Sequence, residues 1–176
     1  MYYKFVWWIM KTCSFFGHRN VQTTPKLCEE LRKIVIYLIE EKGVQNFLFG
    51  SVSKFDDICL KIITELKEDY SQIRRVYVRS QYPYVDKAYK DYLLKSYDDT
   101  FMPSGIEKAG KASYVERNQA MINASDFCIF YYNKEYKPPI KKLTQKTVSG
   151  FQSKSGTRIA YEYAKQKKKE IINLYA

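Results

Sequence analysis

Short apolar runs alternate along this chain with longer stretches in which apolar residues recur every three or four positions. Continuous runs of this length predict buried strands, and the helical period predicts amphipathic helices between them. The expected strands are residues 13–16, 46–49, 74–78, 126–131 and 171–175, and the expected helices are 25–42, 56–70, 114–124 and 155–168. Because strands and helices alternate, we expect an α/β protein with a Rossmann-like open parallel sheet of about five strands and helices on both faces.

Two stretches break this alternation. Residues 80–113 hold many tyrosines without a sustained period, and we expect an irregular insertion there with one short helix near 87–94. Residues 133–154 form a second, lysine-rich insertion. The tyrosines of the first insertion could fold over a bound ligand and stack on an aromatic part of it.

The length of the chain favours one domain. A chain of 176 residues with 45% apolar content can bury one substantial core, so we expect residues 10–176 to form a single unit. Residues 1–9 are predicted to be an N-terminal extension, because Met10 begins a segment that resembles a natural start; a strand beside the sheet is the alternative. The opening segment is too short to span a bilayer and no small-residue cleavage site follows it, so we expect no signal peptide and no membrane partner.

The four cysteines, Cys13, Cys28, Cys59 and Cys128, lie far apart and include no CxxC pair. Three of them fall inside apolar runs, where a buried free thiol is the ordinary interpretation. We therefore expect neither a structural disulfide nor a metal site, and a reducing, cytoplasmic location fits best. No sequence pattern indicates a cofactor.

The net charge points to an anionic partner. The formal charge is +11, and residues 134–169 carry eleven Lys or Arg against two acidic residues. A basic chain of this kind fits nucleic acid, phospholipid or phosphorylated small molecules equally well. The C-terminal third is the electropositive part of the molecule.

A glycine, the only histidine and an arginine directly follow the first expected strand. In an open parallel sheet, ligands bind beyond the carboxyl ends of the strands, which is where Gly17, His18 and Arg19 are expected. The imidazole can donate or accept a proton, and the guanidinium can hold phosphate by two hydrogen bonds. The alternative is that His18 packs or caps a helix and Arg19 is a surface charge.

The second expected strand ends in another small-residue segment. Gly50, Ser51 and Ser53 lead into a helix, and backbone amides at a helix N-terminus favour anions. The segment matches neither GxGxxG nor the Walker A pattern, so a standard dinucleotide or triphosphate site is not expected. Asp56 could hold a ribose hydroxyl, or it is simply an acidic residue stabilised by the helix dipole.

An arginine stands near the start of the helix expected over 114–124. A cation in the first turn of a helix is disfavoured by the helix dipole, so we expect Arg117 to have an anionic partner. A bound ligand would supply that charge, and Glu116 is the alternative partner.

The last helix is expected to open with small residues and hydroxyl groups. Ser155, Gly156 and Thr157 suit a phosphate seated on free backbone amides, and an ordinary Ser or Thr cap is the alternative. Arg158 and Glu162 fall on the outer side of this helix, where we expect an exposed ion pair.

Four segments in this order resemble the SLOG superfamily, which is named for the Smf/DprA and LOG proteins, and in particular its small YpsA-like branch. They read CSFFGHRN, FGSVSKFDD, YVERNQAMINASDFCIFYYN and SGTRIAYEYAKQKKKEIINL. The resemblance implies a Rossmann-like domain that binds nucleotides or nucleotide-derived molecules at the carboxyl edge of its sheet. Members include the LOG phosphoribohydrolases, the single-stranded DNA binders of the DprA type, and domains thought to sense nucleotide signals.

The comparison with the LOG enzymes is informative at two motifs. Arg117 matches a functional arginine of that group, although the lysine that usually follows is Asn118 here. In the motif PGGxGTxxE, Gly156 and Thr157 match the GT, but the position of the catalytic glutamate is Ala160. Glu162 lies two residues later and cannot reach the same point without a shifted helix. The resemblance therefore implies binding more directly than catalysis.

We expect a module that binds a nucleotide or nucleotide-derived small molecule through these four segments, for sensing or sequestering it. A nucleotide N-glycosidase of the LOG type is the alternative, with no assigned catalytic residue. Binding of single-stranded nucleic acid is a third, less favoured hypothesis, supported by the lysine-rich region and the tyrosines. The sequence leaves self-association into a homo-oligomer open.

Overall fold

The computed structural model describes residues 10–50, 52–81, 86–106, 110–138 and 154–175. The elements in chain order are β1 (Lys11–Gly17), α2 (Pro25–Glu40), β2 (Val44–Phe49), α3 (Lys54–Leu66), β3 (Arg74–Val78), α4 (Lys87–Leu93), β4 (Asp99–Phe101), the short 3-10 helix η2 (Gly110–Ala112), α5 (Ser113–Ala124), β5 (Phe127–Tyr131), α6 (Gly156–Gln166) and β6 (Glu170–Asn173). The N-terminal extension predicted over residues 1–9 lies outside the described residues.

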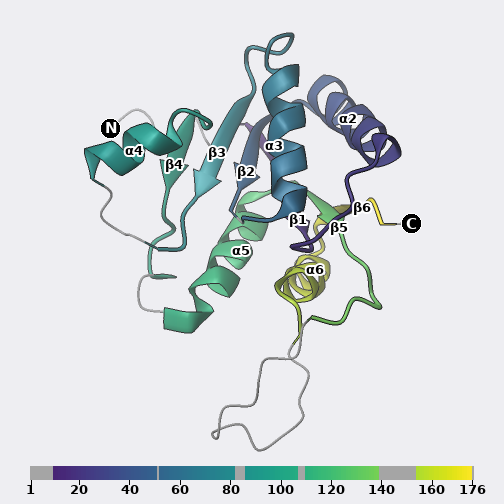
Figure 1. Cartoon of the computed structure of the whole chain (residues 1–176), viewed down its shortest axis with the longest axis vertical. Helices are drawn as coiled ribbons and strands as arrows, with labels where there is room; N and C mark the ends of the chain where they lie inside the picture. The colour runs from purple at the N-terminus through teal and green to yellow at the C-terminus, as the bar shows by residue number, and fades with distance from the viewer. Residues whose placement is uncertain (1–9, 51, 82–85, 107–109, 139–153, 176) are drawn as a thin grey trace, which may run out of the picture.

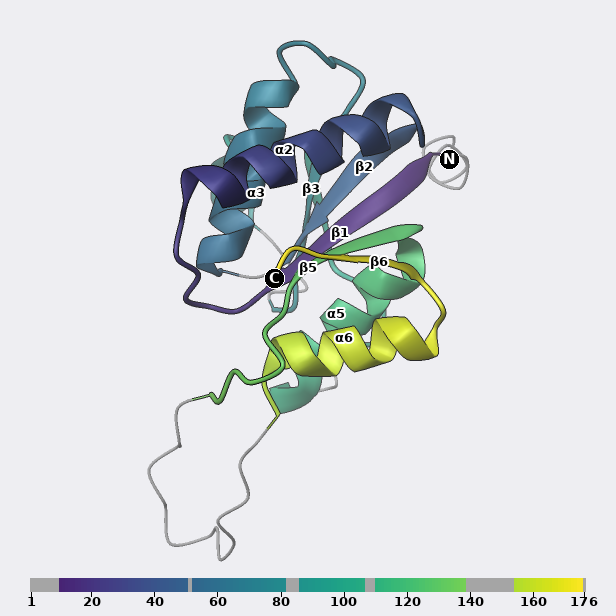
Figure 2. The same ribbon diagram turned by 90° about the vertical axis from the view of Figure 1, so that its right-hand side faces the viewer.

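The strands form one open sheet in the order β4-β3-β2-β1-β5-β6, and every neighbouring pair is parallel. Helices α2 and α3 cover one face, and α5 and α6 cover the other, as the two views of the molecule show (Figure 1, Figure 2). The predicted Rossmann-like parallel sheet with helices on both faces is therefore confirmed, with six strands in place of about five.

Strand β4 was not predicted, because it has only three residues and lies inside the stretch expected to be irregular. Its place is set by hydrogen bonds between Arg75 of β3 and Asp98, which directly precedes β4. The backbone N–H of Arg75 donates to Asp98 Oδ2 at 2.8 Å, and Arg75 Nη2 donates to Asp98 Oδ1 at 3.1 Å. The short helix expected near 87–94 is present as α4, which lies beside the edge strand β4 (Figure 1).

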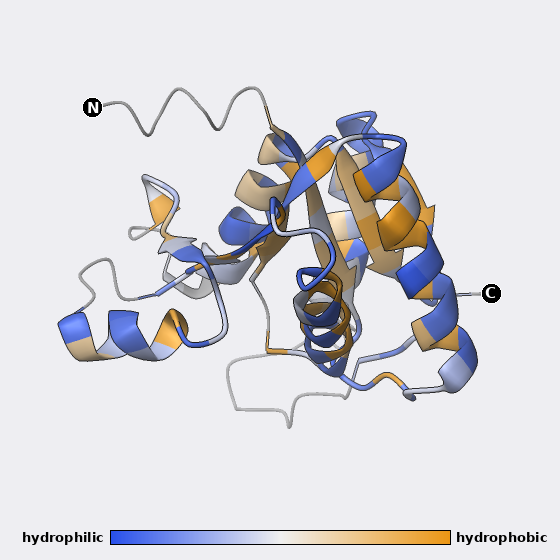
Figure 3. Ribbon diagram, turned by 90° about the horizontal axis from the view of Figure 1, so that it is seen from above, coloured by the Kyte–Doolittle hydropathy of each residue, from blue (hydrophilic) through white to orange (hydrophobic). Residues whose placement is uncertain are grey.

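The core has two layers because the sheet is buried on both faces. Phe15 stacks with Phe47 and Phe49 toward α2 and α3, with ring centroids 6.0 and 5.1 Å apart. On the other face, Phe16 stacks with Phe130 at 5.0 Å toward α5 and α6. Burial on both faces explains why the strands read as continuous apolar runs rather than alternating patterns. In a view coloured by hydropathy, polar residues lie mainly on the outer sides of the helices (Figure 3).

Side-chain hydroxyl groups cap the starts of helices α2 and α3. The Thr24 hydroxyl accepts a hydrogen bond from the backbone N–H of Leu27 at 3.2 Å, and Pro25 is the first helical residue of α2. Gly43 has a φ of 70° in the turn between α2 and β2, a backbone conformation that favours glycine. Helix α3 begins two residues earlier than predicted, because Ser53 caps it, and it ends at Leu66 rather than near residue 70.

All four cysteines are free, and Cys13, Cys59 and Cys128 are buried in the core. Burial raises the pKa of the Cys13 and Cys59 thiols, which keeps them protonated. Within the described ranges, every helix is too short or too polar to cross a bilayer.

Candidate functional site

The order of the strands changes direction at β1. The chain moves outward from β1 through β2 and β3 to β4, and then returns to place β5 and β6 on the other side of β1. The loop after β1 leads to α2 on one face, whereas the loop after β5 leads to α6 on the opposite face (Figure 2). A reversal of this kind opens a crevice between the carboxyl ends of the two central strands, and ligands of doubly wound folds bind there.

Gly17 allows the end of β1 to approach the first turn of α3. A Cβ atom at Gly17 would lie 2.4 Å from the Cβ of Phe55, so only glycine fits. The backbone N–H of Lys54 also donates to the carbonyl oxygen of Arg19 at 3.0 Å. These two contacts hold the loop after β1 against the start of α3, with the side chain of Arg19 exposed.

His18 is buried between the loops that follow β1 and β5. Its imidazole is 3% exposed, and its Nε2 accepts the backbone N–H of Asn133 at 3.0 Å. Because Nε2 is an acceptor, the neutral ring carries its proton on Nδ1. This Nδ1 is buried and has no hydrogen-bond partner in the described part of the chain. Burial lowers the pKa of His18, which favours the neutral form.

Aromatic rings that sequence reasoning missed cover His18. Tyr136 stacks on the imidazole with ring centroids 4.0 Å apart, and Tyr132 lies at 5.9 Å. Tyr132 also contacts Tyr161 of α6 at 4.6 Å, which connects His18 to the first turns of that helix. The sequence signal for these rings was the tyrosine-rich segment YYNKEY, which begins at the last residue of β5.

Gly50 and Arg117 join the end of β2 to α5. Arg117 Nη1 donates to the carbonyl oxygen of Gly50, and Arg117 Nε and Nη2 donate to Asn118 Oδ1 at 3.2 and 3.1 Å. A Cβ at Gly50 would lie 2.8 Å from Arg117 Nε and 2.6 Å from Met121 Sδ. The guanidinium is 3% exposed, and burial lowers its pKa. Arg117 therefore positions the loop after β2 through a hydrogen bond to its backbone.

The predicted start of the helix that carries Arg117 is corrected by one residue. Helix α5 begins at Ser113, directly after η2, so Arg117 lies in the second turn rather than the first. Glu116, the alternative partner, is not among the hydrogen-bond partners of Arg117 in the described structure. Asp56 supplies electrostatic compensation instead, because its carboxylate favours the charged form of the guanidinium.

Ser53 is the N-cap of α3. Its hydroxyl accepts the backbone N–H of Asp56 at 3.1 Å and donates to Asp56 Oδ2 at 2.5 Å. Asp56 is 3% exposed. Asp56 is thus an acidic residue in the first turn of α3, as its structural alternative predicts, and Ser53 is a helix cap. Ser51, also predicted to bind ligand, lies outside the described residues.

The start of α6 combines a cap with an exposed glycine. The Ser155 hydroxyl accepts the backbone N–H of Arg158 at 3.1 Å, and Gly156 is exposed with open space around it. Thr157 is buried beside Ala160 on the inner side of the helix. Ser155 and Thr157 thus have structural roles, whereas the backbone at Gly156 remains accessible.

The predicted outer ion pair of α6 is confirmed. Arg158 Nε lies 2.9 Å from Glu162 Oε1, and Lys154 Nζ lies 2.8 Å from Glu162 Oε2. Ala160, at the position of the LOG catalytic glutamate, is 1% exposed and packs in the core. Glu162 therefore faces away from the core side of α6, and its carboxylate already forms ion pairs with two cations.

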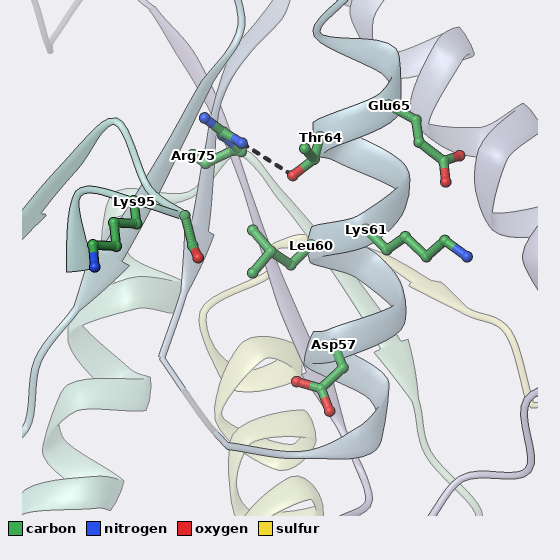
Figure 4. A pocket seen from close by; sticks show the side chains of 8 residues that line it. Asp57, Leu60, Lys61, Thr64, Glu65, Arg75 and Lys95 are labelled. Carbon is green, nitrogen blue, oxygen red and sulfur yellow. Dashed lines mark hydrogen bonds between the residues drawn. The ribbon is translucent and has the colours of Figure 1, made fainter. Parts of the chain in front are cut away.

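Two surface hollows lie away from this edge. One, of about 370 Å³, lies between α3 and β3 and is lined by Leu60, Thr64, Arg75 and Lys95 among others (Figure 4). The other, of about 440 Å³, lies at the amino-terminal edge, where Lys167, Lys168 and Lys169 meet Lys11. In the first, Arg75 Nη1 donates to Thr64 Oγ1 at 3.1 Å, so these two polar groups already have partners within the fold. Neither contains residues predicted to bind ligand.

One of the lysines near the end of α6 has a structural role at the end of α5. Lys169 Nζ donates to the carbonyl oxygens of Asn123 and Ser125, at 3.1 and 2.7 Å, where α5 ends. A cation at a helix C-terminus complements the dipole.

Among the described residues, no group of three His, Cys, Asp or Glu side chains is placed to hold a metal ion.

The four predicted segments thus lie along one edge of the sheet and are linked by contacts. Gly17 and Arg19 contact the start of α3, Gly50 contacts α5, and His18 connects through Tyr132 to α6. A scan against protein-family models and a search of the curated proteins both find no match to this chain.

Proposed function

We propose that this protein binds a nucleotide or a nucleotide-derived small molecule at the carboxyl edge of its sheet, as a sensing or sequestering module. The observation that carries the proposal is the buried Nδ1 of His18, which has no partner in the described structure and lies where the strand order reverses. A buried donor without an acceptor costs about 1–3 kcal/mol. A phosphate, ribose or base oxygen of a ligand would supply the acceptor.

The surroundings of His18 suit an anionic ligand. The exposed guanidinium of Arg19 stands next to it in sequence, and the start of α3 is fixed against the same loop. At the start of α6, the exposed Gly156 leaves room for an oxygen to approach the free backbone amides. These groups hold an anion by orientation and charge, with no need for a metal.

The resemblance of the four segments to the SLOG superfamily supports the same proposal, because nucleotide-derived ligands are expected at this edge in that superfamily. Binding without bond cleavage is favoured by α6. The residue that matches the LOG glutamate is Ala160, and Glu162 is engaged by Arg158 and Lys154. The four free thiols fit a reducing, cytoplasmic location, which we propose with it.

The experiment is a thermal-shift and calorimetric panel with AMP, cyclic AMP and ADP-ribose, and inorganic phosphate as the ion-only control. A ligand present at one hundred times its Kd stabilises the folded state by about 2.7 kcal/mol, which raises the Tm of a chain this long by about 5–10 °C. His18→Gln keeps an acceptor for the N–H of Asn133 and removes the Nδ1 donor. It should fold and lose affinity. Absence of any shift with all three nucleotides would overturn the proposal.

A further inference from the structure

Tyr114 is a large aromatic residue that remains half exposed beside the strand ends. Its side chain is 51% exposed, and it lies in the first turn of α5. Helix α5 extends past the carboxyl ends of β2 and β3, so this first turn stands beyond the edge of the sheet (Figure 1). The fold does not use this ring as a core residue.

The ring of Tyr114 is nevertheless held in place from two sides. Gln81 Nε2, in the segment that follows β3, lies 2.8 Å from the Tyr114 hydroxyl and donates to it. The guanidinium carbon of Arg117 lies 5.5 Å from the ring centroid, which is a cation–π distance. Arg117 is itself fixed by the carbonyl oxygen of Gly50. A continuous set of contacts therefore joins the ends of β2 and β3 to this exposed ring.

A fixed, exposed ring of this kind is a stacking surface. Aromatic bases stack on tyrosine because both have flat π faces, and the interaction tolerates different bases. A ring fixed before binding loses little freedom when a base stacks on it. Neighbouring strands lie about 4.8 Å apart, so the ends of β1 and β3 are separated by roughly 10 Å. That separation matches the reach of a nucleotide whose phosphate lies near β1 and whose base lies near β3.

We propose that Tyr114 is the base-stacking residue of the site, with Arg117 and Gln81 as the residues that position its ring. This inference rests on the proposed nucleotide-binding function, and it adds that an aromatic base is part of the ligand. Recognition by stacking gives affinity for a base with little discrimination between bases.

The test compares AMP and GMP with ribose 5-phosphate, which lacks the base, by calorimetry. Tyr114→Ala should lower the affinity for AMP and GMP by about 5- to 100-fold and leave the affinity for ribose 5-phosphate unchanged. Tyr114→Phe, which keeps the ring, should retain most of the affinity. Tyr37→Ala is the matched control, because Tyr37 is 47% exposed on α2 and has the Lys42 ammonium 5.5 Å from its ring.

The possible failures are distinguishable. Unchanged AMP and GMP affinity in Tyr114→Ala, or an equal loss for ribose 5-phosphate, would overturn the stacking role while nucleotide binding itself stands. Equal affinity of the wild-type protein for AMP and ribose 5-phosphate would also overturn it. If the wild-type protein binds none of the three, the proposed function fails and the stacking role fails with it.

Discussion

His18 accepts a hydrogen bond from the backbone N–H of Asn133 at 3.0 Å, and this bond joins the loop after β1 to the loop after β5. The two residues lie on either side of the point where the strand order reverses. Protonation of Nε2 would break the bond, because the ring nitrogen would lose its free electron pair. The chain's only histidine thus connects the protonation state of one ring to the geometry of the candidate site.

The first prediction concerns pH. Burial lowers the pKa of His18 in the folded protein, whereas an unfolded histidine titrates near 6.5. Below about pH 6.5 the unfolded chain therefore binds the proton more readily. The free energy of unfolding should be highest above that pH and should fall as the pH drops through the window below it. Urea unfolding of the wild type and of His18→Gln between pH 5 and 8 checks this, and parallel pH profiles would contradict it.

The second prediction concerns the contact between β1 and α3. Gly17→Ala places a methyl group 2.4 Å from the Cβ of Phe55, so the strand end and the helix must move apart. We expect a loss of about 1–3 kcal/mol in the free energy of unfolding. Gly156→Ala is the control, because a Cβ there meets open space. Equal urea midpoints for the two variants would show that the close approach does not constrain the fold.

The third prediction separates a positioning role of Arg117 from direct ligand contact. Arg117→Met leaves the carbonyl oxygen of Gly50 without its guanidinium donor and should lower the free energy of unfolding by about 1–3 kcal/mol. Arg117→Lys should restore only part of this, since an ammonium cannot reproduce the planar fork that reaches both Gly50 and Asn118. Denaturant unfolding measures both variants. Full stability of Arg117→Met combined with loss of nucleotide binding would instead indicate a ligand contact.

The fourth prediction concerns strand β4. Asp98 is partly buried, which raises its pKa, but the hydrogen bonds from Arg75 outweigh this and the pKa is lowered overall. Asp98→Asn should therefore cost about 1–3 kcal/mol and speed hydrogen exchange at the amides of β4. Asp99→Asn, which removes a more exposed ion pair with Arg74, should cost less than about 1 kcal/mol. Similar exchange in the two variants would contradict the assigned role of Asp98.

Local sequence signals predicted the features that depend on neighbouring residues. The apolar runs and helical periods predicted the alternating strands and helices, and the spacing of Arg158 and Glu162 predicted their ion pair. Each strand, each helix and the ion pair depend on residues no more than a few positions apart, and the alternation of strands with helices then favours parallel pairing. Buried strands and helix starts are therefore accessible to sequence reasoning.

Features that depend on distant residues were missed. Strand β4 has no hydrophobic period of its own and is placed by Arg75 on the neighbouring strand. The direction of the Arg117 side chain is set by Gly50, which lies 67 positions earlier. The partner of His18 is 115 positions away. The edge of the sheet could be predicted from sequence, but the orientation of side chains along it could not.

The most direct test of a nucleotide site at His18 is nitrogen-15 NMR of the single imidazole during titration with AMP, cyclic AMP and ADP-ribose. We expect a neutral ring with its proton on Nδ1, and a saturable shift of the Nδ1 resonance with at least one of the three nucleotides. His18→Gln should weaken binding of that nucleotide while remaining folded. Nucleotide binding with an unchanged imidazole spectrum, or no binding of any of the three, would contradict a nucleotide site at this edge of the sheet.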